Sequence, residues 1–250
     1  MQPFSIVIVA KDSADKIGRL LSSIQGLSDD VIVCDTGSSD DTIGISARAG
    51  ARVYSIPWQG YGRSKNAAIG FAKHDWILSL DSDEKVDETL YRQLQQWTPV
   101  NEHTVHQVLW KNFFSDQWIR HSDWGSSWKN RLFHKYTVHW DDAIAHEDVT
   151  SEQKLQFVQF NGYLEHYTFK DTREYASKMV HSAMITAQKY HEKGKKASVL
   201  KLVFSPLYSF FKAYVLKLGF LDGYKGWLIA VTTGYYTFIK YVRLRELNRQ

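Results

Sequence analysis

Trp76-Ile77-Leu78-Ser79-Leu80-Asp81-Ser82-Asp83 is an apolar run that ends in two carboxylates placed one residue apart. A short apolar run closed by polar residues is typical of a buried strand. The carboxyl ends of the strands are the edge at which an open α/β sheet binds its ligands. The stretch therefore predicts a strand that carries paired acids to the ligand-binding edge of a sheet.

The spacing of Asp81 and Asp83 favours a divalent cation. A cation bound by such acids can bridge the two phosphates of a sugar nucleotide and neutralise the charge that builds on the departing diphosphate. The cluster therefore suggests glycosyl transfer. The alternative is a solvated turn in which Glu84 opens the next helix as an N-terminal acid, so the surrounding motifs must decide.

The chain before this strand alternates strand and helix signals. Residues 4–10, 30–34 and 51–56 are apolar, β-branched runs, and Ile17, Leu20, Leu21 and Ile24 mark one face of a helix between the first two. No charged and hydrophobic leader precedes residue 4, so we expect no signal peptide. This order predicts right-handed parallel crossovers.

The turn after the second predicted strand, residues 35–42, contains Asp35, Gly37 and several hydroxyl residues. The glycine allows a tight turn, and Asp35 places a carboxylate at the sheet edge, where it can accept a hydrogen bond from a pyrimidine N–H. The alternative is a helix N-cap, which Ser39 or Asp40 would satisfy equally well. We take Asp35 as the better nucleotide candidate.

A second loop, residues 57–66, contains two glycines and the cations Arg63 and Lys65 before a predicted helix that runs through Ala72. Side chains and backbone donors near a helix start can bind phosphate. The alternative is that both cations are merely solvated.

The opening strand, the turn at residues 35–40, the loop at residues 63–66 and the stretch at residues 80–84 together resemble the inverting glycosyltransferases of family 2. The resemblance implies an α/β GT-A fold, Rossmann-like, with a mostly parallel central sheet and a nucleotide-sugar site, here followed by a C-terminal helical extension. It also implies which residues bind the nucleotide sugar: Asp35, Arg63, Lys65, Asn66, Asp81, Ser82 and Arg131.

The resemblance also implies the metal and its ligands. Asp83 would hold Mg²⁺ or Mn²⁺ with help from Asp81, and His166 would complete the set, because GT-A enzymes often supply a late histidine to this metal. An imidazole in a mostly oxygen-ligated site suits manganese at least as well as magnesium.

Inverting transfer needs a carboxylate to take the proton of the acceptor hydroxyl. Residues 145–147 fall where the family often carries a His-Glu or Glu-Asp pair, and Glu147 is our candidate base. Asp141 and Asp142 are rival bases, and a surface salt bridge is the structural alternative for Glu147. General base catalysis is typically worth about 10²–10⁴ in rate.

Composition supports one compact enzyme. The chain has 250 residues, of which 44% are hydrophobic and 23% are charged. Its single cysteine, Cys34, falls in a predicted buried strand and has no partner, which favours a reducing cytoplasm. We assign residues 1–170 to the catalytic domain and residues 171–250 to a basic, amphipathic helical extension.

The extension carries a net charge of +9, whereas residues 1–170 carry −5. Lysines interrupt its apolar runs before they reach the roughly 20 residues that span a bilayer, so we expect no transmembrane helix. Basic residues among Phe, Tyr and Leu favour a helix in the membrane interface. The alternative is a helical pair packed on the catalytic domain.

Residues 219–226 and 238–241 resemble one branch of the family, the lipopolysaccharide inner-core glucosyltransferases. That branch places β-1,4-linked glucose from UDP-glucose on heptose. The resemblance implies a cytoplasmic enzyme held peripherally at the inner face of the cytoplasmic membrane, with a UDP-sugar donor and a lipopolysaccharide core acceptor.

Other functions stay open. The chain could transfer galactose to a different surface polysaccharide, or it could bind nucleotide sugars without catalysis. A nucleic-acid-binding protein ranks last, because the positive charge lies outside the half that carries the motifs.

Overall fold

The computed structural model describes residues 2–142 and 148–249 and divides into two compact units. The α/β unit comprises residues 1–110 and 127–166, and the helical unit comprises residues 111–126 and 167–250. The sequence prediction placed a single boundary at residue 170. The structure instead groups residues 111–126 with the helices, because the buried Asp222 accepts hydrogen bonds from the backbone N–H groups of Arg120 and His121.

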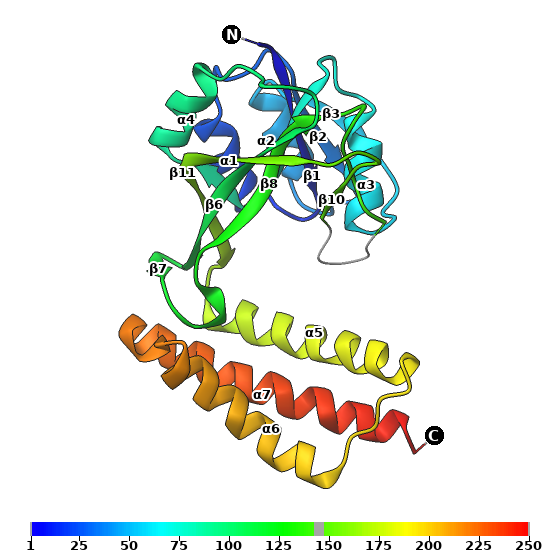
Figure 1. Cartoon of the computed structure of the whole chain (residues 1–250), viewed down its shortest axis with the longest axis vertical. Coiled ribbons are helices and arrows are strands. Elements are labelled where there is room, and N and C mark those ends of the chain that lie inside the picture. Colours follow the sequence, from blue (N-terminus) through cyan, green and yellow to red (C-terminus); the bar gives the residue numbers. More distant parts are fainter. Residues whose placement is uncertain (1, 143–147, 250) are drawn as a thin grey trace. The chain divides into compact units, whose positions relative to one another are not determined.

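The α/β unit begins with alternating strands and helices, as the sequence predicts (Figure 1). These elements are β1 (Phe4–Ala10), α1 (Ile17–Ser23), β2 (Val31–Asp35), α2 (Thr42–Arg48), β3 (Arg52–Ser55), α3 (Tyr61–Ile69), β4 (Trp76–Asp81), β5 (Glu84–Val86) and α4 (Glu88–Gln95). The remaining strands are β6 (Thr104–Phe114), β8 (Ser127–His134), β9 (His139–Trp140), β10 (Val149–Thr150) and β11 (Gln156–Phe169).

Among the described residues, nine strands form one sheet, with the order β3-β2-β1-β4-β8-β6-β11-β5 and with β7 (Gln117–Ile119) paired to β6. The pairs β1–β2, β1–β4 and β2–β3 are parallel, whereas β8 joins β4 and β6 in antiparallel fashion. The predicted α/β fold is confirmed. The parallel strands gather their carboxyl ends at one edge, and the antiparallel strands bring later residues of the chain beside them.

Strand β1 shows why the parallel part forms. Phe4, Ile6 and Ile8 pack with α1 and α4 on one face, while Val7 packs with α3 on the other. A parallel strand covered on both faces is apolar throughout its length. The predicted burial of Cys34 is also confirmed, since it lies in β2 within the second of these cores.

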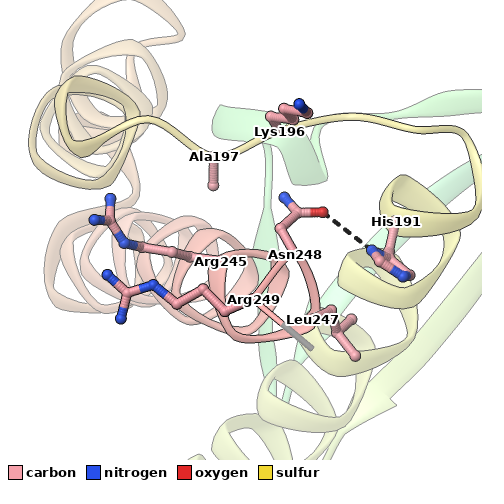
Figure 2. A pocket seen from close by; sticks show the side chains of 7 residues that line it. All are labelled: His191, Lys196, Ala197, Arg245, Leu247, Asn248 and Arg249. Atoms are coloured by element: carbon pink, nitrogen blue, oxygen red, sulfur yellow. Dashed lines mark hydrogen bonds between the residues drawn. The ribbon is translucent and has the colours of Figure 1, made fainter.

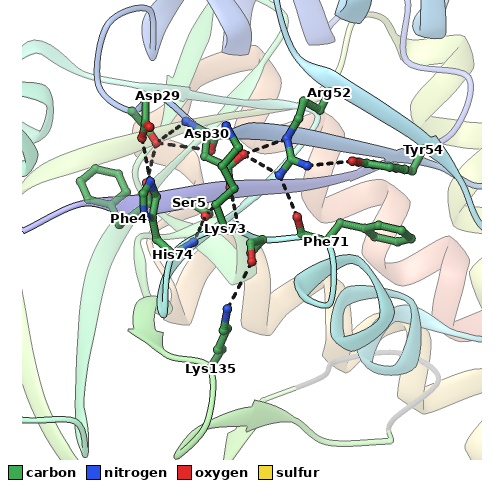
Figure 3. A network of polar contacts seen from close by, with 12 residues as sticks. Phe4, Ser5, Asp29, Asp30, Arg52, Tyr54, Phe71, Lys73, His74 and Lys135 are labelled. Atoms are coloured by element: carbon green, nitrogen blue, oxygen red, sulfur yellow. Dashed lines mark hydrogen bonds and ion pairs between the residues drawn. The ribbon is translucent and has the colours of Figure 1, made fainter.

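A polar network holds the opposite, amino-terminal edge of these strands (Figure 3). Asp30 is buried and accepts hydrogen bonds from Ser5 Oγ at 2.5 Å, from the backbone N–H of Lys73 at 2.8 Å and from Arg52 Nη2 at 2.6 Å. Although burial opposes the charge, these donors hold the pKa of Asp30 below its usual value. The network links β1, β2, β3 and the turn before β4, so its role is structural.

The helical unit contains β7 (Gln117–Ile119), η1 (Ser122–Trp124), α5 (Thr172–Glu192), α6 (Val199–Phe211), η2 (Lys212–Leu216), η3 (Gly219–Asp222) and α7 (Gly223–Leu247). Within this unit α7 packs against both α5 and α6 (Figure 1).

One helical window in this unit, Val199–Leu216, is long and apolar enough by length and composition to cross a membrane, with a mean hydropathy of 1.4 over 18 residues. The sequence argument excluded such a segment because lysines interrupt the tail. However, Lys201 and Lys212 lie near the two ends of this window and leave its middle uncharged. Only 6% of the window is buried within the structure.

Candidate active site

Asp35 and Asp81 lie at the same edge of the sheet, separated by one strand. Asp35 ends β2 and pairs in register with Ala10 of β1, while Asp81 ends β4 and pairs with the adjacent Val9. The parallel crossovers place both carboxyl ends together, as the sequence predicts.

Two cations hold Asp81. Lys65 Nζ lies 2.8 Å from Asp81 Oδ1, and Arg131 Nη2 lies 2.6 Å from Asp81 Oδ2. The same nitrogen of Arg131 lies 2.6 Å from Glu84 Oε1, and Glu84 Oε2 accepts the backbone N–H of Asp81 at 2.9 Å. The end of β4 is therefore a cross-linked charge network, contributed by α3, β4, β5 and β8.

The pKa values of the two acids of this network are shifted in opposite directions. Although burial opposes ionisation, Arg131 and Lys65 hold the pKa of Asp81 well below its usual range. Burial, opposed by Arg131, raises the pKa of Glu84. The sequence alternative for Glu84, a solvated acid that opens a helix, is wrong: Glu84 is fully buried in β5, and α4 begins at Glu88 with Asp87 as its N-cap.

Trp110 is part of the site and was not singled out from the sequence. Its indole N–H donates to Glu84 Oε1, and its ring stacks on His166 with centroids 4.0 Å apart. Lys129 Nζ lies 4.2 Å from the ring centroid. Sequence patterns show no sign of this role, because Trp110 reaches the site through the pairing of β6 with β8 and β11, which are distant in the sequence.

Asp83 and His166 are brought together, with His166 Nε2 3.4 Å from Asp83 Oδ2. Burial opposes charge on both groups, but each stabilises the charged form of the other, which lowers the pKa of Asp83 and raises that of His166. Two of the three predicted metal ligands, Asp83 and His166, therefore form one pair between the β4–β5 turn and β11.

The donor set of this pair fits a divalent cation. Adjacent ligands of an octahedral cation at about 2.1 Å lie roughly 3 Å apart, close to the observed spacing. Among the described residues, no three His, Cys, Asp or Glu side chains form a ready metal cluster. Asp81 already binds two cationic side chains, so Asp83 and His166 would be the protein ligands and phosphate or water would supply the rest.

The Asp35 carboxylate organises its own turn. Its Oδ2 accepts the backbone N–H groups of Gly37 and Ser38, each at 2.9 Å, and its Oδ1 accepts the Ser38 hydroxyl. Gly37 has a φ of 100°, which favours glycine. Near the start of α2 it is Asp40 that accepts the N–H of Thr42, at 3.0 Å, so Asp35 is not the helix cap. Its contact with a base stays a prediction.

The predicted phosphate loop is largely helical. Arg63, Lys65 and Asn66 lie within α3, which begins at Tyr61. Lys65 is buried against Asp81, whereas Arg63 is exposed and forms an ion pair of 2.9 Å with Asp142. Asn66 exchanges two hydrogen bonds with the backbone of Trp140, at 2.8 and 3.0 Å, and so holds β9.

The other predicted residues are placed as follows. Ser82 Oγ lies 2.9 Å from Ser13 Oγ, which ties the β4–β5 turn to the segment after β1. Arg131 is buried in β8. Of the rival bases, Asp142 is paired with Arg63, and Asp141 Oδ1 accepts the N–H of Asp148 at 3.3 Å. Glu147 lies outside the described residues.

Comparison with known proteins agrees with this geometry. The sequence model of the family described as glycosyl transferase family 2 matches residues 5–153. An uncharacterized glycosyltransferase of Rickettsia prowazekii (strain Madrid E) is 26% identical over 263 residues, covering 99% of this chain and 88% of that protein.

Two further proteins are more distant. The lipopolysaccharide core biosynthesis glycosyltransferase LpsC of Rhizobium meliloti (strain 1021) is 23% identical over 251 residues, covering 98% of this chain and 92% of that protein. The structure of glucosyl-3-phosphoglycerate synthase from Mycobacterium tuberculosis with Mn²⁺, UDP and glucosyl-3-phosphoglycerate is 25% identical. The match covers 46% of this chain and 45% of the synthase chain, with a TM-score of 0.33.

Proposed function

The chain belongs to glycosyl transferase family 2, and from that premise we propose that it transfers glucose from UDP-glucose, with inversion, to a heptose of the lipopolysaccharide inner core. The observation that carries the proposal is the Asp83–His166 pair at the carboxyl end of β4, next to the charge network of Asp81. A site that binds a nucleotide diphosphate and assists its departure needs cations in this position.

The donor would lie along the edge formed by β2 and β4. Asp35 is our proposed contact for the uracil N–H, since it ends the strand two places from β4 in the sheet. Lys65 and Arg131 provide fixed positive charge beside Asp81, and Arg63 lies on the exposed side of the same helix as Lys65. These charges favour a diphosphate at the end of β4.

Asp83 and His166 would hold Mg²⁺ or Mn²⁺. When bound, the ion would neutralise the charge that develops on the leaving UDP. Trp110 stacks on His166 and thereby orients its ring, so that Nε2 stays directed toward Asp83. The chain itself thus keeps the two ligands in place.

Inversion requires the acceptor hydroxyl to attack the anomeric carbon from the face opposite UDP. Glu147 is the proposed base that takes the hydroxyl proton, on its position in the family motif. Asp141 and Asp142 stay as rivals because they lie on the same segment of the chain. The bond to UDP breaks as the new glycosidic bond forms, and the proton passes to the carboxylate.

The acceptor proposal is supported by the likeness to LpsC, whose name assigns it to lipopolysaccharide core biosynthesis. It is supported as well by the net charge of +9 in residues 171–250, which suits a phosphorylated saccharide or the anionic lipid around it. We therefore propose a peripheral enzyme at the inner face of the cytoplasmic membrane, without a nucleic-acid partner.

The test is transfer by the purified chain from a panel of UDP-sugars to lipopolysaccharides truncated at each core residue, with Mn²⁺, Mg²⁺ or chelator. We expect UDP release with UDP-glucose and a heptose-terminated acceptor, and a β-linkage in the product by NMR. UDP release with UDP-galactose and not with UDP-glucose would show that the donor is UDP-galactose. Binding of UDP without sugar transfer to any acceptor would contradict catalysis.

A further inference from the structure

Helix α6 exposes its apolar side and turns polar residues toward its neighbouring helix. Its largest apolar side chains are exposed and recur every three or four residues along one face: Leu200, Val203, Phe204, Leu207, Tyr208 and Phe211. Toward α7 it presents Ser209, whose Oγ accepts a hydrogen bond from Thr237 at 3.0 Å. A helix on the surface of a water-exposed protein turns its apolar face inward, so water is an unfavourable environment for this face.

Helix α7 shows the same arrangement. Its exposed stripe consists of Tyr224, Trp227, Val231, Tyr235 and Phe238. The buried side carries small residues at intervals of four, Gly226, Ala230 and Gly234, and a Cβ added at Gly234 would lie 3.1 Å from Pro206 O of α6. Close packing through small and hydroxyl residues is how helices associate in lipid, where apolar burial gives no driving force.

The two stripes open on the same side of the helix pair. The contacts Pro206–Gly234 and Ser209–Thr237 mark the line along which α6 and α7 touch, and Figure 1 shows the two helices running in opposite directions. Successive residues of an α-helix are rotated by about 100° around its axis. Counted this way, the centre of each exposed stripe lies roughly 100–140° from the line where the two helices touch, and both stripes are displaced in the same direction of rotation when each helix is viewed from its own N-terminus. Because one helix is reversed, both stripes face one way. We call this combined surface the apolar face.

Two arginines continue the α7 stripe at its end. Arg245 and Arg249 follow Phe238 at helical spacing and line a cavity of about 510 Å³, together with Lys196 (Figure 2). Their guanidinium groups extend from the same side of α7. Among the described residues, no carboxylate forms an ion pair with Arg245, Arg249 or Lys196. Adjacent cations without a carboxylate partner indicate an anionic ligand, and a phosphate suits their geometry.

The length of the uncharged segments limits how deeply the apolar face can enter a bilayer. The uncharged run of α6, residues 202–211, is about 15 Å long, and that of α7, residues 226–239, is about 21 Å long. Both are shorter than the hydrocarbon core of roughly 30 Å. The uncharged part of the face can therefore enter one leaflet but is too short to cross both. The window Val199–Leu216 reaches a spanning length only by including Lys201 and Lys212.

We propose that the apolar face docks on a bilayer that contains anionic phospholipid. The aromatic and aliphatic stripes enter the boundary between headgroups and acyl chains, and Arg245 and Arg249 bind lipid phosphate at one end of the face. This inference rests on the membrane association proposed above, and it adds the docking surface, the depth of entry and the headgroup chemistry. Tyr and Trp side chains are suited to this boundary.

Flotation of the full chain with vesicles tests the proposal. The vesicles contain phosphatidylethanolamine alone or mixed with phosphatidylglycerol. The double variant Phe204→Glu/Trp227→Glu should lose flotation on both. Arg245→Ala/Arg249→Ala should lose affinity only for the anionic vesicles, by about fivefold for each arginine. Both variants change exposed or half-exposed side chains, so circular dichroism should show an unchanged fold.

Two matched controls alter the same side-chain types elsewhere. Tyr136→Glu adds an acid at an aromatic residue that is 74% exposed, and Arg173→Ala removes an exposed arginine at the start of α5. Both should float like the wild type. If they lose flotation as the test variants do, binding is a property of overall charge and hydrophobicity, and the assignment to this face is overturned.

Three other results would overturn the proposal. One is normal flotation of Phe204→Glu/Trp227→Glu. Another is resistance of the wild type to extraction by alkaline carbonate, which would indicate a spanning helix. The third is a dimer in light scattering that this variant dissociates, which would mean that a second copy covers the face.

Transfer to delipidated core oligosaccharide separates this inference from the proposed enzymology, because docking variants should retain that activity. Failure of the wild type to transfer any sugar would reject the proposed function and leave the flotation result standing.

Discussion

Lys65 of α3 and Asp81 at the end of β4 form an ion pair in which Lys65 Nζ lies 2.8 Å from Asp81 Oδ1. Arg131 takes the other oxygen. The two cations keep the Asp81 carboxylate ionised. They also hold its side chain in one orientation, because Lys65 and Arg131 are themselves almost fully buried. The arrangement makes Asp81 a positioning group at the end of the strand and leaves Asp83 and His166 as the proposed ligands of a cation.

Substitution Lys65→Met should therefore destabilise the fold by about 3 kcal/mol, at the low end for breaking a buried pair, since Arg131 still neutralises Asp81. Urea unfolding measures this change. Arg63→Ala, which breaks the exposed pair with Asp142, should destabilise the fold much less, because water screens an exposed ion pair. Equal costs for the two variants would show that the Lys65 pair is no stronger than a surface contact.

Substitution Asp83→Ala should reduce metal-dependent transfer by at least about 10²-fold, because several kcal/mol of charge neutralisation on the leaving group would be lost. Steady-state UDP release at increasing Mn²⁺ measures the effect, and chelator should abolish wild-type turnover. Asp41→Asn is the control, since Asp41 pairs with Arg48 on the exposed surface. Wild-type turnover in Asp83→Ala would remove the metal proposal.

Substitution Glu147→Gln should lower kcat by about 10²–10⁴ while UDP affinity stays unchanged, because a general base acts on the acceptor and not on the nucleotide. Single-turnover transfer and UDP titration measure the two quantities separately. Asp141→Asn and Asp142→Asn serve as matched comparisons. A larger loss of kcat in either of them would reassign the base.

Stability should decrease in acid through His106. Burial lowers the pKa of His106 to about 4, below the 6.5 of an exposed histidine, and its Nε2 accepts a hydrogen bond from Trp97 Nε1 at 3.0 Å. The unfolded chain therefore binds this proton more readily. The contribution is full above pH 6.5 and is lost as the pH falls toward 4, by up to about 3 kcal/mol.

The measurement for this prediction is the free energy of unfolding between pH 7 and pH 4, in the wild type and in His106→Gln. The variant removes the titrating imidazole. Its free energy of unfolding should therefore fall less between pH 7 and pH 4, by the contribution assigned to His106. Parallel curves would show that other groups cause the acid sensitivity.

Local sequence pattern was sufficient for the parallel part of the sheet. Strands β1 to β4 could be predicted because each is an apolar run between turn residues, and Asp35 and Asp81 could be placed at one edge because parallel crossovers align carboxyl ends. Arg63 and Lys65 were correctly associated with the start of a helix, but assigned to the loop before it rather than to α3 itself.

The sequence by itself determined the family, the strand order at the start of the chain and the acids that end β2 and β4, since these depend on local periodicity and short motifs. Only the tertiary structure decided the partners of those acids. Antiparallel pairing across many residues brings Arg131, Trp110 and His166 to β4 and buries Glu84 among them. The packing of α6 on α7 leaves the apolar side of α6 exposed. A pattern within one segment cannot specify which distant segment will cover it, because that choice depends on the packing of the whole chain.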